Sequence, residues 1–358
     1  MEAADAMTRG EEFLDRYGGF LAPLGAAYGW VMRAREFAYQ QRIKRAEIPS
    51  LPVVSVGNLS LGGTGKTPTV LLLARQLLSV GRRPAIVSRG YRRTTPSQEP
   101  LLVSDGRQIL RSPSESGDEP AMLARALPNV PVAVCAKRAR AIALLAEKNL
   151  ADCVILDDGF QHLAVARSLD LVLLDSDPRR MRVFPAGFLR EPPSALKRAH
   201  GVLLTSAMSE EEVESVRAWL SRAFPHLTQL RIFFEPAMLR PLGGDDALPL
   251  STLAGKRVLA FAGIAAPRRF FHDVQSLCLQ AVPLALPDHT AYDSVTIETI
   301  HTMARERYCE VCVTTAKDAV KLEAFAATLD LPCYVLEQEA RVEPSAKLED
   351  LVLTALRA

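Results

Sequence analysis

Residues 52–68 read PVVSVGNLSLGGTGKTP, an apolar run that passes into a glycine-rich loop and then into the start of a helix. The stretch approaches the pattern Gly-x-x-x-x-Gly-Lys-Ser/Thr, in which backbone N–H groups and a helix N-terminus hold phosphate groups. Ser60 stands where the strict pattern has its first glycine. Gly62, Gly63 and Gly65 still permit close backbone approach. The order of strand, loop and helix therefore predicts a P-loop for a nucleoside triphosphate, rather than a glycine-rich turn without a ligand.

Each residue type in this loop has a predicted task. Lys66 neutralises charge on the phosphates, Thr67 offers its hydroxyl to Mg²⁺, and Pro68 is tolerated because it lies in the first helical turn. The predicted nucleotide-binding residues are consecutive: Gly62, Gly63, Thr64, Gly65, Lys66, Thr67 and Pro68.

Two adjacent carboxylates follow another apolar run, in CVILDDGFQH at residues 153–162. A P-loop needs a carboxylate at the end of a neighbouring strand to hold the water shell of the metal, and Asp157 and Asp158 stand at such a place. The alternative for either residue alone is an Asx-turn with a solvated aspartate.

Short apolar runs alternate with helix-like stretches from Leu51 onward, which predicts a mostly parallel sheet flanked by helices on both faces. Within residues 47–228 the runs are PVVSV, AIVS, VPVAV, CVILDD, LDLVLLD and GVLLT. The pattern restarts with LRIFF, RVLAFAG, VCVTT and CYVL, so residues 229–358 are expected to form a second, smaller α/β domain. Two helices have clear signals: one ends at Gly81, and one begins at Ser209, where Glu212 completes a predicted capping box.

The composition excludes several classes of protein. Lysine and arginine number 43 against 41 acidic residues, a net charge of +2, which disfavours a nucleic-acid partner. The six cysteines and the lack of a signal-peptide pattern favour a reducing compartment. Cys309 and Cys312 form one C-x-x-C without a second pair at zinc-site spacing, so we interpret them as core thiols.

Residues 1–46 form a predicted N-terminal helical segment of apolar and basic character. Its uncharged run, residues 17–32, contains sixteen residues, including Pro23 and four glycines. A membrane span needs about 20 apolar residues. A basic stretch follows, so the alternatives are a segment that lies in a membrane interface and a helical hairpin packed on the protein's own core.

Three comparisons narrow the class of P-loop protein. The guanine-binding signature Asn/Thr-Lys-x-Asp is missing, because Lys317 and Asp318 are adjacent in the nearest match. The lysine-bearing loop of partitioning and metal-insertion ATPases is missing too, because Leu61 precedes the glycines. The chain resembles the tetraacyldisaccharide 4'-kinase family, which phosphorylates the lipid A precursor. The motifs that carry this resemblance are FLAPLGAAYG, VVSVGNLSLGGTGKTP, SRGYRR, SGDEP, ILDDGFQH, FPAGFLREP, FAGIAAPRRFF, PDHTAY and TTAKDAVKL.

The resemblance implies roles for residues far from the P-loop. Asp118 is the residue expected to activate the sugar hydroxyl, and Glu119 is expected to help hold Mg²⁺. His289 matches the histidine that the family pairs with that aspartate. Thr290 stands where a second histidine is common, which leaves the role of that position open.

Substrate-binding roles are implied for Arg89, Tyr91 and Arg190, since the substrate already carries one phosphate. In the FPAGFLREP motif, Phe188 stands where the family usually has a small residue or proline, and Arg190 keeps its place in the motif. The implied catalytic residues are Asp118, His289, Lys66 and Asp158, and the implied metal-binding residues are Thr67, Asp157 and Glu119. Asp157, Asp158, Gln161 and His162 map onto the Walker B motif of the family, in which the first aspartate is the expected metal partner and His162 is expected to lie behind it.

The expected activity is transfer of the γ-phosphate of ATP, with Mg²⁺, to the 4'-hydroxyl of a tetraacylated glucosamine disaccharide 1-phosphate. The acyl chains would stay partly in the bilayer, which favours the interfacial interpretation of residues 17–32. The expected protein is a monomer bound peripherally to the cytoplasmic face of the bacterial inner membrane. Two alternatives stay open: a P-loop kinase with a soluble acceptor, and a nucleotide-switched ATPase without an acceptor.

Overall fold

The computed structural model describes residues 2–90 and 98–357, with only the backbone described for residues 2–17. These residues group into two compact units. The larger unit comprises Phe13–Phe234 and Ala340–Ala358, and the smaller unit comprises Glu235–Glu339 with the chain up to Glu12. The C-terminal residues, expected in the smaller domain, therefore group with the larger unit.

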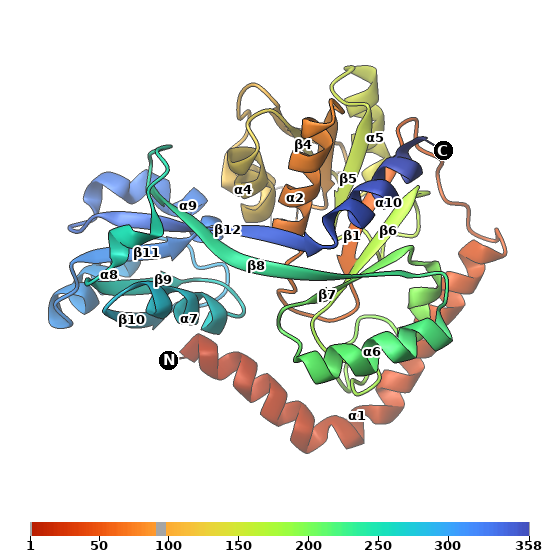
Figure 1. The fold of residues 1–358 in the computed structure, drawn as a ribbon, viewed down its shortest axis with the longest axis horizontal. Coiled ribbons are helices and arrows are strands. Elements are labelled where there is room, and N and C mark those ends of the chain that lie inside the picture. Colours follow the sequence, from red (N-terminus) through yellow and green to blue (C-terminus); the bar gives the residue numbers. More distant parts are fainter. Residues whose placement is uncertain (1, 91–97, 358) are drawn as a thin grey trace. The chain divides into compact units, whose positions relative to one another are not determined.

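The larger unit is built on a mostly parallel sheet with the strand order β8-β7-β6-β1-β5-β2-β4-β3. Of these strands, Figure 1 labels β8, β7, β6, β1, β5 and β4. All described pairs are parallel except β3 with β4. Its strands are β1 (Val53–Asn58), β2 (Pro84–Ser88), β3 (Leu101–Asp105), β4 (Pro131–Val134), β5 (Cys153–Asp157), β6 (Leu169–Leu174), β7 (Gly201–Thr205) and the first half of β8 (Thr228–Pro241). Its helices are α1 (Glu2–Gln40, from Phe13 onward), α2 (Lys66–Ser79), α3 (Pro113–Ser116), α4 (Asp118–Ala126), α5 (Arg138–Glu147), the 3₁₀ helix η1 (Pro193–Arg198), α6 (Glu210–Ala223) and α10 (Ser345–Arg357).

Burial explains why the strand β1 lies at the centre of this sheet. Every residue of β1 is buried, and it pairs with β5 on one side and β6 on the other. Val54 and Val56 pack with apolar residues of α2, α4 and α10, while Val53 packs on the opposite face with α5. Alternate residues of a strand point to opposite faces, so a β1 that is buried along its whole length requires helices on both faces.

The smaller unit has a parallel sheet with the strand order β10-β9-β11-β12. Its strands are β9 (Arg257–Ala262), β10 (Gln280–Ala285), β11 (Val311–Thr315) and β12 (Cys333–Glu343, which continues into the larger unit). Its helices are η2 (Leu250–Leu253), α7 (Arg268–Leu277), α8 (Ser294–Glu306), α9 (Ala316–Leu322) and η3 (Glu323–Thr328). Two apolar clusters cover the two faces of this sheet, so the unit has a core of its own.

The N-terminal segment is one helix, α1, with Pro23 inside it, and not a hairpin. Glycines form the face that contacts the rest of the larger unit. A Cβ on Gly18 would lie 2.9 Å from the Ala186 carbonyl oxygen, and one on Gly25 would lie 2.8 Å from that of Val183. Over the ranges that the structure describes, no helix is both long and apolar enough to cross a membrane.

Most predicted elements are confirmed, and the differences have local causes. The strands β3 and β10 were not predicted, since neither is a continuous buried apolar run and Pro283 interrupts the second. The capping box at Ser209 is only half formed. Its hydroxyl accepts from the Glu212 N–H, but the Glu212 carboxylate accepts instead from the Asp177 N–H.

Candidate functional site

The carboxyl ends of the central strands of the larger unit bring the predicted nucleotide residues together. Strand β1 ends at Asn58 before the loop, and the neighbouring strand β5 ends at Asp157. Val56 lies opposite Asp157 in the register of these two parallel strands. Ligands of open α/β sheets bind at this edge, so the predicted P-loop and carboxylate pair share one location.

The backbone geometry shows that the loop needs glycine at different positions for different reasons. Gly65 precedes α2 with φ 88°, and a Cβ there would lie 2.2 Å from the ring of Phe234. Gly62 also has a positive φ, of 115°, but it faces open space, as Gly63 does. Space beside the backbone at Gly62 and Gly63 is what a phosphate-binding loop requires.

Ser60 has a specific partner at the position where the strict pattern has glycine. Its hydroxyl donates to Asp175 Oδ1 at 3.2 Å. On either side of it, the Leu61 N–H donates to the Phe188 carbonyl at 2.7 Å, and the Arg190 N–H donates to the Leu59 carbonyl at 2.7 Å. The entry of the loop is therefore hydrogen-bonded to the segment that contains the FPAGFLREP motif.

Lys66 is held by two side chains at the strand ends. Its Nζ donates to Asn58 Oδ1 at 3.2 Å and lies 3.5 Å from Asp158 Oδ1. Asp158 also accepts from Arg190 at 2.8 Å. Arg190, which the resemblance assigned to substrate binding, is thus part of an ion-pair chain that ends at the lysine. Asp158 has a φ of 51°, so this carboxylate is placed by a left-handed backbone.

The two adjacent aspartates differ in charge state. Burial raises the pKa of Asp157 to about 7, and the nearby carboxylates of Glu119 and Asp158 add to the rise. Burial also disfavours the charged form of Asp158, but Lys66 and Arg190 outweigh it and hold the pKa of that carboxyl below its ordinary value. Asp158 is therefore ionised and paired, whereas Asp157 gains its charge only near neutral pH unless a cation lies beside it.

Asp118 and Glu119 lie in the first turn of α4, and both are half-buried. Gly117, with φ 96°, precedes them. Because the Glu119 carboxylate acts electrostatically on Asp157, α4 brings the GDE motif to the end of β5. The structure thus brings together two predicted metal-binding carboxylates that lie far apart in sequence.

The next predicted site residue, His162, is surrounded by arginines. Its Nδ1 is 3.0 Å from Arg138 Nη1, and burial followed by the charge of Arg138 lowers its pKa to about 3. Arg89 contributes to the same positive field, and Arg35 of α1 donates to the Gln161 carbonyl at 3.0 Å. Tyr91, the third predicted substrate residue, lies outside the described residues.

Two observations test whether a nucleotide and a divalent cation fit this site. Thr64 Oγ1 is buried without a hydrogen-bond partner in the described chain, inside the predicted phosphate cradle. Among residues 2–90 and 98–357, no group of three or more His, Cys, Asp or Glu side chains is placed to hold a metal ion. Mg²⁺ at such sites takes one or two carboxylates and completes its shell with phosphate oxygens and water. Asp157 with Thr67, which is the second residue of α2, fits that pattern.

His289 belongs to the smaller unit, in the loop that follows β10. Its side chain is 15% exposed, and its Nε2 lies 3.4 Å from Lys317 Nζ and 3.7 Å from Asp288 Oδ2. The histidine is therefore fixed by ionic neighbours in its own unit.

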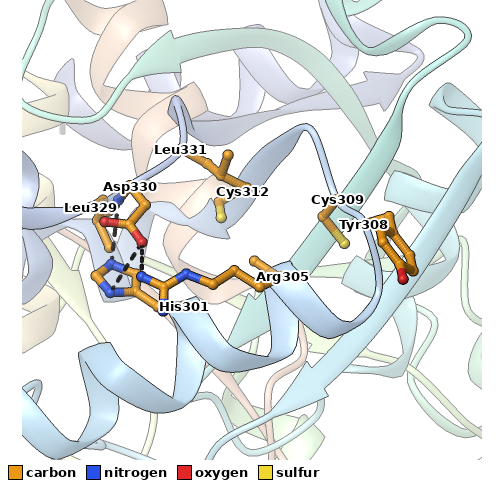
Figure 2. Close-up of a pocket in the computed structure, with 9 residues that line it drawn as sticks. His301, Arg305, Tyr308, Cys309, Cys312, Leu329, Asp330 and Leu331 are labelled. Carbon is orange, nitrogen blue, oxygen red and sulfur yellow. Dashed lines mark hydrogen bonds and ion pairs between the residues drawn. The ribbon is translucent and has the colours of Figure 1, made fainter.

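The smaller unit also contains a pocket of about 130 Å³ (Figure 2). His301 and Arg305 of α8 both approach Asp330, and Cys309 and Cys312 complete part of the wall. Burial raises the pKa of the Cys309 thiol, and it raises that of Cys312 to about 12. Both thiols are buried and free, which confirms their interpretation as core residues.

Two residues near the predicted nucleotide site of the larger unit, Asn58 and Arg138, were not predicted from the sequence. Asn58 ends a fully buried strand as a polar residue, which is the signal that identifies it. Arg138 is buried at the first position of α5, but nothing in its sequence context distinguishes it from the neighbouring Lys137 and Arg140.

Comparisons with known proteins identify the family of this chain. The model of the tetraacyldisaccharide-1-P 4'-kinase family matches residues 18–357. The tetraacyldisaccharide 4'-kinase of Syntrophus aciditrophicus is 41% identical over 92% of this chain and 90% of the relative. That of Desulfotalea psychrophila is 39% identical over 92% of this chain and 94% of the relative. A crystal structure of LpxK from Aquifex aeolicus in complex with ATP is 30% identical, with a TM-score of 0.79 over 95% of this chain and 99% of that one. This chain therefore belongs to the tetraacyldisaccharide-1-phosphate 4'-kinase family.

Proposed function

We propose that this chain transfers the γ-phosphate of ATP to the 4'-hydroxyl of a tetraacylated glucosamine disaccharide 1-phosphate, a step of lipid A biosynthesis. The observation that carries the proposal is the meeting of the P-loop lysine with two carboxylate-bearing motifs at one edge of the sheet. Family membership gives the reaction class, and the geometry supports roles for individual residues.

The P-loop is proposed to bind the nucleotide through the backbone of residues 62–65 and the N-terminus of α2. Lys66 would compensate negative charge on the β- and γ-phosphates. Thr67, Asp157 and Glu119 would hold Mg²⁺, which supplies positive charge at the transferred group when bound. Supporting this assignment, the carboxyl of Asp157 is crowded by two other carboxylates, an arrangement that a cation stabilises.

Asp118 is proposed to accept a hydrogen bond from the acceptor hydroxyl and to take its proton during transfer. Its place at the first residue of α4, next to Glu119, supports this role. His289 is proposed to assist it, and Arg89 to bind the phosphate that the acceptor carries. Asp158 would act through its ion pair with Lys66.

Incubation of the purified protein with radiolabelled ATP and the disaccharide 1-phosphate, followed by chromatography, tests the reaction. The proposal expects labelled lipid product, and expects Asp118→Ala to lose that product while still binding ATP. The exposed Glu214→Gln on α6 is the matched control, with unchanged product. A soluble-acceptor kinase would leave the lipid unlabelled, and a nucleotide switch would release labelled phosphate into water without any acceptor product.

We also propose that α1 binds the surface of the membrane that holds the substrate, on the cytoplasmic face of the inner membrane. Its apolar side chains include Phe20, 84% exposed, Trp30, 70% exposed, and Val31, 56% exposed. The exposed Arg33 and Arg42 follow them, which is the pattern of a helix that lies in an interface.

Flotation with vesicles of phosphatidylethanolamine and phosphatidylglycerol tests this surface. The wild-type protein should float, and the double substitution Phe20→Ser with Val31→Ser should leave most of the protein at the bottom of the gradient. Val295→Ser removes a comparably exposed apolar side chain from α8 and should float as the wild type does. Equal flotation of all three proteins would refute the proposed surface.

A further inference from the structure

In the smaller unit, three polar residues of one short helix contact the loop around His289 or the glycine that binds its backbone: Lys317, Asp318 and Lys321, in the TTAKDAVKL motif. Thr315, the cap of this helix, contacts Asp318. We propose that Lys317 and Asp318 are positioning residues that set the place and orientation of the His289 imidazole. The proposal rests on the proposed catalytic role of His289.

Asp318 controls the backbone of the loop. Its carboxylate is fully buried, and Oδ2 accepts from the Gly263 N–H at 3.0 Å and from the Thr315 hydroxyl at 2.7 Å. The Gly263 carbonyl in turn accepts from the His289 N–H at 3.0 Å. A buried carboxylate is thus joined to the backbone of the histidine through a single residue, Gly263.

Gly263 lies between these groups because a larger residue does not fit. A Cβ there would lie 2.9 Å from Asp318 Oδ1, 3.2 Å from the Pro287 carbonyl oxygen and 3.3 Å from Thr290 Cβ. The FAGIAAPRRFF, PDHTAY and TTAKDAVKL motifs therefore meet at one point, where the carboxyl ends of β9, β10 and β11 lie together.

Lys317 acts on the imidazole itself. Its Nζ lies 3.4 Å from His289 Nε2 and 3.4 Å from Asp288 Oδ1. An ammonium group has no acceptor, so in a hydrogen bond between these two groups Lys317 is the donor and Nε2 the acceptor. One turn further along α9, Lys321 donates to the Thr290 carbonyl at 2.8 Å, which fixes the far side of the loop.

Helix capping alone does not account for these contacts. The Thr315 hydroxyl accepts from the Asp318 N–H, which is an ordinary N-cap. The hydrogen bond from the Gly263 N–H to Asp318 and the contact between Lys317 and His289 both leave the helix. The first reaches the glycine that binds the His289 N–H, and the second reaches the imidazole. The backbone of His289 has a φ of 63°, a region that a residue other than glycine adopts only when its surroundings hold it there.

A double-mutant cycle on the full-length enzyme tests the proposal, with kcat and KM for ATP measured by phosphorylation of the lipid acceptor. Lys317→Met should lower kcat roughly 10- to 100-fold, as misplacement of a catalytic group by up to about 1 Å does, with KM for ATP unchanged. In the His289→Ala background the same substitution should have no further effect, because its effect passes through the imidazole. Lys317→Arg should recover most of the activity, and Lys256→Met controls for loss of a positive charge in this unit.

The proposal would be overturned if the double variant lost kcat by the product of the losses in Lys317→Met and His289→Ala. Wild-type kcat in a folded Lys317→Met protein would also overturn it. If Lys317→Met does not fold, Asp318→Asn is put through the same cycle. Wild-type kcat in His289→Ala would refute the proposed catalytic role of the histidine, and with it this inference. A fall in His289→Ala without one in Lys317→Met refutes the inference alone.

Discussion

The pKa of Asp157 leads to a prediction about stability. In the folded chain its pKa is about 7, against about 3.9 for an aspartate in an unfolded chain. Between these values the folded state holds the proton and the unfolded state does not, so ionisation opposes folding as the pH rises. The destabilisation is absent below about pH 4 and complete above about pH 7.

The size of the effect follows from the two pKa values. A rise from 3.8 to about 7 corresponds to about 4 kcal/mol in total, of which about 2 to 3 kcal/mol develops between pH 5 and pH 8. Asp157→Asn removes the ionisable group. The measured quantity is the free energy of unfolding of the wild type minus that of Asp157→Asn. This difference should fall by about 2 to 3 kcal/mol between pH 5 and pH 8 and level off above about pH 7.

Urea unfolding at several pH values, without nucleotide or divalent cations, measures this difference. Both tryptophans of the chain, Trp30 and Trp219, lie in the larger unit, so their fluorescence reports the unit that contains Asp157. Glu119→Gln is the control variant, because it removes the larger of the two acidic causes of the raised pKa and should move the fall to lower pH. A difference that stays constant from pH 5 to pH 8 would refute the reasoning.

Two further predictions concern the loop. Gly65→Ala should destabilise the protein by about 2 to 5 kcal/mol in urea unfolding, the sum of a left-handed backbone and the overlap with Phe234, whereas Gly63→Ala should change little. Equal unfolding midpoints for the two variants would contradict this account. Asn58→Leu should lower kcat about tenfold, because Lys66 loses an acceptor at 3.2 Å; steady-state kinetics with unchanged kcat would exclude that role.

The P-loop and the carboxylates after β5 were predictable because their signals are local. An apolar run, three glycines and Lys66 are adjacent in sequence, and the fold needs nothing distant to place them in order. The bonds that hold the loop were not predictable on the same ground. Ser60 is bound by Asp175, more than a hundred residues away, and only the folded sheet brings them together.

The fold was less predictable where an element is partly exposed, or where it packs on a core that is distant from it in sequence. Strand β10 carries Pro283 and is half-buried, so it lacks the apolar run that identified the other strands. The helix α10 buries Leu348, Val352 and Leu356 against the core of the larger unit, although it follows the smaller one in sequence. Its amphipathic pattern predicts a helix but does not specify which core covers its apolar face.

The segment from Val183 to Arg190 contacts both α1 and the P-loop. It packs against Gly25 of the helix and pairs with Leu59 and Leu61 at the loop entry. With α1 in the membrane interface as proposed, the distance between Lys66 and the lipid headgroups is set within one compact unit. The enzyme would then select acceptors by the distance between their acyl chains and their sugar hydroxyl. A hydroxyl that lies too far from the acyl chains, or too close to them, would not meet the phosphate even if every polar contact were available.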